Sequence, residues 1–95
     1  MRILILADGN NKIGMGHVYR SLNLAKNLKK NGHKIMFLTQ KNQSKKIFSQ
    51  IFDCKLSRKL NNNSTKNYLK NFSPNIIIID KLKETKANLS FLHKF

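Results

Sequence analysis

The first thirty residues of the chain combine three features that together restrict the possible folds. Residues 3–6 form a continuous apolar run, a glycine-containing turn follows at residues 8–16, and apolar positions recur at helical spacing from Val18 to Leu28. A continuous apolar run is typical of a strand in a sheet that is covered on both faces. A strand, a turn and an amphipathic helix in this order form the first half of a parallel βαβ unit. We therefore predict an α/β fold.

The rest of the chain repeats this alternation. The apolar patterns predict strands at residues 2–7, 34–39, 54–56 and 75–79, and helices at residues 16–31 and 43–53, from Ser64 through Tyr68, Leu69 and Phe72, and from about Thr85 through Leu89, Leu92 and Phe95. Gly32 suits the position just after the first helix, and Pro74 ends the third. Alternating strands and helices predict a Rossmann-like open parallel sheet with right-handed crossovers and the strand order 3-2-1-4.

The length and composition fit one small domain. The last helical pattern reaches Phe95 without a capping residue, a glycine or a polar tail, so we expect residues 1–95 to be the N-terminal lobe of a longer protein. The single cysteine, Cys54, excludes an internal disulfide and fits a reducing compartment. The apolar runs are far shorter than the roughly 20 residues of a membrane span. We expect a cytoplasmic protein without a membrane span.

The formal net charge of +15, from 19 basic and 4 acidic residues, raises nucleic acid as a partner. Only Arg2, Arg20 and Arg58 are arginines, whereas base and phosphate recognition depends on the bidentate guanidinium group. The lysines are scattered among asparagines and isoleucines, as expected from an A/T-rich genome at permissive surface positions. We therefore expect no nucleic-acid partner.

Spacing excludes two common functions of the glycine turn. A phosphate-binding Walker loop needs Lys followed by Ser or Thr after its second glycine, but Gly14 is followed by Met15 and Gly16. A dinucleotide fingerprint needs a third small residue where the chain has Tyr19, and an acidic residue after the second strand, where it has Thr39, Gln40 and Lys41. Neither a Walker-type nucleotide site nor NAD binding is therefore predicted.

Two interpretations of His17 remain open. It can be a structural histidine at an ordinary strand-to-helix turn, or it can be a general base. The helix dipole disfavours imidazolium near a helix N-terminus, which would keep the ring neutral and able to accept a proton. Gly14 and Gly16 would allow a substrate to approach the backbone closely.

The predicted strand order supports the second interpretation. Strands one and four are then neighbours, and the sheet changes its direction of growth between them, which opens a crevice at their carboxyl ends. Asp8, His17 and Asp80 would all line it. Asp80 could act on a ligand or only cap the following loop, and Asp8 is better suited to bracing the turn through backbone hydrogen bonds. Arg20 could bind a phosphate or carboxylate, pair with Asp8 or stay solvated.

A family resemblance rests on these residues. A strand, a DG pair, a short gap and GxGHxxR at the start of a helix are matched at Asp8, Gly9, Gly14, Gly16, His17 and Arg20. Over residues 7–39 the chain resembles the nucleotide-sugar hydrolases of pseudaminic acid synthesis and their relatives, the SpsG-like spore-coat polysaccharide glycosyltransferases. The later stretch NIIIIDKLKET resembles the SpsG-like branch more than the hydrolase branch.

The resemblance implies a GT-B architecture, with this chain as the N-terminal half and UDP held largely by a C-terminal lobe. It implies that His17 activates water at the anomeric carbon of a UDP-linked deoxy-diacetamido sugar, with inversion and without a metal or other cofactor. Gly14, Gly16, Asp8, Arg20 and Asp80 would then contact the substrate. The chain alone would be inactive. The alternatives are a glycosyltransferase, in which His17 deprotonates an acceptor hydroxyl, and a non-catalytic basic binding module.

Overall fold

A computed structural model of the chain describes residues 1–9, 15–57 and 62–80. The strands are β1 (Arg2–Ala7), β2 (Lys34–Thr39), β3 (Asp53–Leu56) and β4 (Ile76–Asp80), and the helices are α1 (Gly16–Lys30), α2 (Asn42–Phe48) and α3 (Asn63–Phe72). The helix predicted from about Thr85 lies outside the described residues. Among the described residues, no helix is both long and apolar enough to traverse a lipid bilayer.

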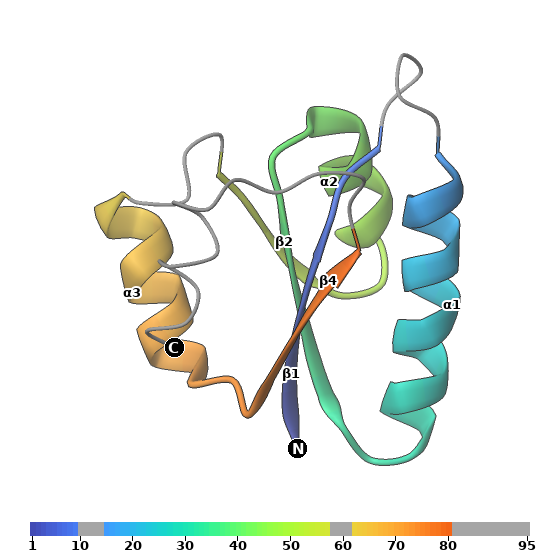
Figure 1. The fold of residues 1–95 in the computed structure, drawn as a ribbon, viewed down its shortest axis with the longest axis horizontal. Helices are drawn as coiled ribbons and strands as arrows, with labels where there is room; N and C mark the ends of the chain where they lie inside the picture. Colours follow the sequence, from blue (N-terminus) through green and yellow to red (C-terminus); the bar gives the residue numbers. More distant parts are fainter. Residues whose placement is uncertain (10–14, 58–61, 81–95) are drawn as a thin grey trace.

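The four strands form one parallel sheet in the order β3-β2-β1-β4 (Figure 1). The predicted α/β class and strand order are therefore confirmed. β1 lies between β2 and β4, with Leu4 level with Met36 on one side and with Ile77 on the other. This central position explains why the side chains from Ile3 to Ala7 are almost entirely buried.

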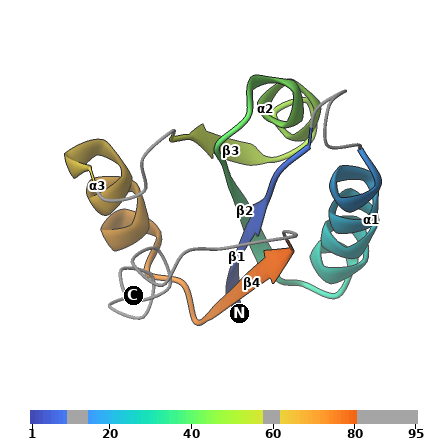
Figure 2. The same cartoon turned by 45° about the horizontal axis from the view of Figure 1, so that its top comes forward.

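Helices cover both faces of this sheet (Figure 2). Alternate residues of β1 point to opposite faces, so Ile3 and Ile5 pack toward α1 and α2, whereas Leu4 and Leu6 pack toward α3. The α1 and α2 face contains the larger cluster, made of Ile3, Ile5, Ala7, Val18, Leu22, Ala25, Ile35, Phe37, Phe48 and Phe52. The three layers fix α1 against β1 and bring its first turn to the carboxyl end of the sheet.

The C-terminus of α1 is closed by a glycine, as the sequence predicts. Gly32 has a φ of +89°, its N–H bonds to the Lys29 carbonyl, and the His33 N–H bonds to the Leu28 carbonyl. These two bonds form a Schellman motif, which satisfies carbonyls that the helix itself leaves without partners. The chain then turns directly into β2.

The predicted end of the second helix is wrong. The helix predicted to reach Asp53 ends at Phe48, and Asp53 begins β3. Residues four positions apart also come together in the turn that follows α2. There the Phe52 N–H bonds to the Phe48 carbonyl at 2.8 Å, and the Phe52 ring packs against Phe37.

The third helix begins earlier than predicted. Its N-cap is Asn62 rather than Ser64, because the Asn62 side-chain oxygen accepts the Thr65 N–H at 2.8 Å. Both residue types favour this position, so composition alone could not separate them.

Candidate functional site

The site lies at the carboxyl end of β1 and β4, where the first turn of α1 meets the sheet. Asp80 is the last residue of β4 and lies level with Ala7 of β1. His17 is the second residue of α1, and Arg20 and Ser21 follow on the next turn. Helix and strand therefore bring together residues that are about sixty positions apart in the sequence.

Four donor groups from α1 surround the Asp80 carboxylate. Its Oδ1 atom lies 2.8 Å from His17 Nδ1 and also accepts from Arg20 Nη2. Its Oδ2 atom accepts from Ser21 Oγ at 2.6 Å and from Arg20 Nε at 3.3 Å. An ionised carboxylate offers about four acceptor positions, so these contacts occupy its full capacity. Binding of a metal or a substrate by Asp80 would require one donor to leave.

This environment keeps Asp80 ionised. Partial burial raises the pKa of its carboxyl group, but the hydrogen bonds from Arg20, Ser21 and His17 and the charge of Arg20 outweigh it and lower the pKa to about 2. The same contact raises the pKa of the Arg20 guanidinium. At neutral pH, Asp80 is a fixed negative charge beneath the imidazole of His17.

The partners of His17 Nδ1 determine which ring nitrogen carries the proton. Asp80 Oδ1 can only accept, which favours a proton on Nδ1 and leaves Nε2 as an acceptor. Arg20 Nη2, 2.6 Å from the same nitrogen, can only donate and favours the opposite tautomer. Arg20 already bonds to both Asp80 oxygens, so it keeps hydrogen-bond partners when the Nδ1 proton is assigned to the contact with Asp80, and we adopt that tautomer.

The exposure of the cluster is graded from the sheet outward. The Asp80 side chain is 18% exposed, that of His17 is 27% exposed, and that of Arg20 is 65% exposed. The imidazole is therefore neither buried in the core nor fully solvated. A ligand can reach His17 and Arg20 from solvent, whereas Asp80 lies behind them.

Asp8 belongs to a separate, buried network. Its Oδ1 atom accepts from Thr39 Oγ1 at 2.7 Å and from the Gln40 N–H at 2.6 Å. The Thr39 hydroxyl also bonds to Ser44 Oγ, and the Gly9 N–H donates to that same oxygen at 3.3 Å. Asp8 therefore braces the ends of β1 and β2, and Arg20 pairs with Asp80 rather than with Asp8.

Of the two glycines predicted to contact substrate, Gly14 and Gly16, the structure describes Gly16. Gly14 lies outside the described residues. Gly16 is the first residue of α1, and a Cβ atom placed on it would meet no other described atom within 4 Å. A side chain at this position would therefore meet no steric obstacle among the described residues.

Sequence reasoning missed Ser21, Thr39 and Ser44. All three hydroxyls are buried, and each forms a hydrogen bond that fixes an aspartate or its neighbour. A signal for Ser21 was present, because it lies four positions after His17 and so shares its helix face. Thr39 and Ser44 carried no comparable signal, since only the strand pairing brings them beside Asp8.

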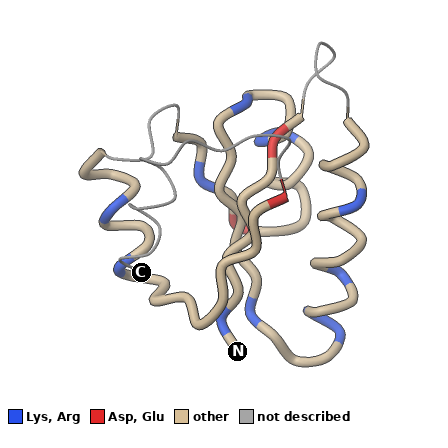
Figure 3. Tube along the Cα trace, viewed as in Figure 1, with Lys and Arg blue, Asp and Glu red and all other residues tan. Residues whose placement is uncertain are grey.

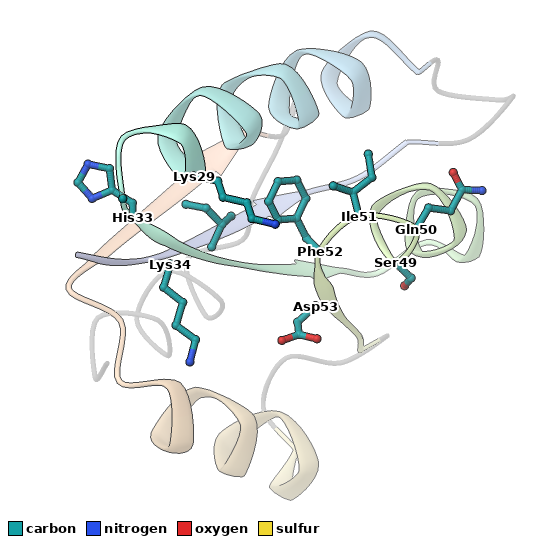
Figure 4. Close-up of a pocket in the computed structure, with 10 residues that line it drawn as sticks. Lys29, His33, Lys34, Ser49, Gln50, Ile51, Phe52 and Asp53 are labelled. Carbon is teal, nitrogen blue, oxygen red and sulfur yellow. The ribbon is translucent and has the colours of Figure 1, made fainter.

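A groove of about 510 Å³ lies at the opposite end of the strands from the His17 site (Figure 4). Lys29, His33, Lys34, Phe52 and Asp53 are among its lining residues, and the Lys29 ammonium lies 5.5 Å from the centre of the Phe52 ring. The groove is formed at the amino ends of β2 and β3, so it is not part of the His17 site. Within the described ranges, no group of three or more His, Cys, Asp or Glu side chains is arranged to hold a metal ion.

Fold and site together define an α/β protein with a parallel sheet and a partly exposed histidine–aspartate pair at its carboxyl edge. No family model matches the chain, and no solved structure gives a significant match. The chain is similar to an uncharacterized protein of Methanocaldococcus jannaschii, with 41% identity over 85 residues, or 86% of this chain. These residues span only 17% of the length of that archaeal protein.

Proposed function

We propose that the chain carries the base-bearing lobe of an enzyme that hydrolyses a nucleotide sugar. The proposed substrate is a UDP-linked deoxy-diacetamido sugar used for a pseudaminic-type acidic sugar of surface glycans. The observation that carries the proposal is the contact between His17 Nδ1 and Asp80 Oδ1 at the carboxyl edge of the sheet. The substrate class comes from the family resemblance of the GxGHxxR segment, and the contact supports the role of base.

The proposed chemical step needs one proton acceptor. His17 Nε2 removes a proton from water while the water oxygen forms a bond to the anomeric carbon. The bond between that carbon and the UDP oxygen breaks, and UDP leaves with the bonding electrons, which inverts the anomeric centre. General base catalysis of this kind contributes typically 100- to 10,000-fold to a rate.

Asp80 serves this step without touching the substrate. A carboxylate bonded to Nδ1 holds the ring in the tautomer with a free Nε2 and stabilises the imidazolium that forms. The low pKa of Asp80 ensures that it remains an acceptor across the physiological pH range. In this proposal Asp80 is a positioning residue rather than a substrate contact.

Arg20 and the start of α1 provide the positive charge. The Arg20 side chain is mostly exposed, so its outer N–H groups can meet the diphosphate of a nucleotide sugar. The first turn of a helix also carries N–H groups without intrahelical partners and the positive end of the helix dipole. Both features would stabilise negative charge beside His17.

The test uses the full-length protein with its second lobe. Replacing His17 with Ala is expected to lower UDP release from the UDP-sugar by about 100-fold or more, because no other group takes the proton. Circular dichroism and urea unfolding monitor the fold, and His33→Ala is the matched control, because His33 lies at the far end of α1. Near-normal UDP release by the His17→Ala variant would contradict the proposal.

The second candidate is a glycosyltransferase that uses the same base. The later segment NIIIIDKLKET, which forms β4 and the residues after it, resembles the SpsG-like branch and favours this candidate. Nε2 would then deprotonate an acceptor hydroxyl instead of water. Incubation with the UDP-sugar alone separates the two, because only a hydrolase should release free sugar at a useful rate without an acceptor.

A basic binding module gains no support from the distribution of charge. Lys and Arg side chains occur on β1, β2 and β3 and on all three helices, which cover both faces of the sheet (Figure 3). A binding module would place them on one face.

A further inference from the structure

Side chains of one helix, α1, contact both carboxylate oxygens of Asp80. His17 and Ser21 are four residues apart on α1, so their side chains project from the same face. His17 contacts Oδ1, and the Ser21 hydroxyl donates to Oδ2 at 2.6 Å. Ser21 is 1% exposed, so its hydroxyl is shielded from solvent in the folded chain. A serine inside a helix often bonds to the carbonyl four residues earlier, but this one bonds across to β4.

Ser21 is the only rigid partner of Oδ2 among the described residues. The other described partner is Arg20 Nε at 3.3 Å, on a side chain that is 65% exposed. The last torsion of an aspartate is broad, so a carboxylate held at one oxygen can turn about its own axis. Turning would move Oδ1 away from His17 Nδ1. The Ser21 hydroxyl opposes that rotation.

We propose that Ser21 is a positioning residue that fixes the tautomer of His17 through Asp80. Arg20 Nη2 and Asp80 Oδ1 compete for His17 Nδ1, and they favour opposite tautomers. With Oδ2 held by Ser21, Oδ1 stays against Nδ1, the proton remains on Nδ1, and Nε2 stays available as a proton acceptor. The catalytic consequence rests on the proposed function, whereas the tautomer can be measured without any substrate.

The direct test is the tautomer of His17 in the full-length protein. Long-range ¹H–¹⁵N NMR spectra of ¹⁵N-histidine-labelled protein at about pH 8.5, where an ordinary imidazole is neutral, report which ring nitrogen carries the proton. The wild type is expected to show mainly the Nδ1–H form, and Ser21→Ala a marked gain of the Nε2–H form. Ser21→Thr retains a hydroxyl and should restore the wild-type spectrum.

Two further variants keep the test decisive. If Ser21→Ala does not fold, Ser21→Cys replaces it, because a thiol has nearly the same size but is a much weaker donor. Thr65→Val removes a fully buried hydroxyl from α3, where it donates to Ser57 Oγ at 2.6 Å. That variant should lose stability without a change in the His17 tautomer, which separates positioning from a general effect of a lost buried hydrogen bond.

Kinetics of the full-length enzyme provide the second measurement. Ser21→Ala is expected to lower kcat by about 10-fold or more with KM nearly unchanged, because loss of the Ser21 hydroxyl misplaces the base without removing a substrate contact. An unchanged His17 tautomer in both Ser21→Ala and Ser21→Cys overturns the inference. If the His17 tautomer changes in Ser21→Ala but the wild-type protein releases no UDP, the positioning role of Ser21 is supported and the proposed function is contradicted.

Discussion

At the scale of single residues, Asp80 links the site to the stability of the fold. Its folded pKa of about 2 lies below the ordinary value of 3.8, so the unfolded chain takes up a proton first as the pH falls. The contribution of Asp80 is therefore complete above about pH 4 and is lost between about pH 4 and pH 2, and we expect it to amount to about 1–2 kcal/mol. Urea unfolding of the wild type and of Asp80→Asn at several pH values measures it: the difference between their free energies of unfolding should shrink across this interval. A constant difference would contradict the assignment.

At the scale of elements, the sequence predicted what local pattern and general topology rules determine. β1, β2 and α1 follow from continuous apolar runs and helical spacing, and the place of β4 beside β1 follows from the rules for parallel sheets. The end of α2 was missed because Phe52 reaches the core from a turn as well as it would from a helix. The hydrogen bond between Ser21 and Asp80 joins α1 to β4. The spacing places Ser21 on the helix face of His17, but no local pattern shows that its hydroxyl bonds to a carboxylate on a strand about sixty residues away.

The α1 terminus offers a prediction at the same scale. Gly32 has a left-handed backbone, which costs other L-residues about 1–2 kcal/mol, and a Cβ there would meet no described atom within 4 Å. Gly32→Ala is therefore expected to lower the free energy of unfolding by about 1 kcal/mol through backbone strain alone. Gly32→Asn is the control, because asparagine tolerates this conformation, and it should cost clearly less. Equal losses in urea unfolding would show that the backbone conformation is not the cause.

At the scale of the whole molecule, the question is whether the charge of +15 has a partner. Basic side chains on opposite faces of the sheet cannot contact one duplex together, so we expect weak, sequence-independent binding to DNA that disappears near 200 mM salt. The variants Lys26→Gln/Lys30→Gln on α1 and Lys66→Gln/Lys70→Gln on α3 remove equal charge from the two faces. In fluorescence anisotropy with duplex DNA, both should reduce the salt dependence of binding by the same amount. A loss confined to one pair, or tight binding that persists at about 200 mM salt, would reveal a nucleic-acid surface and would restore the basic binding module as the better account of this chain.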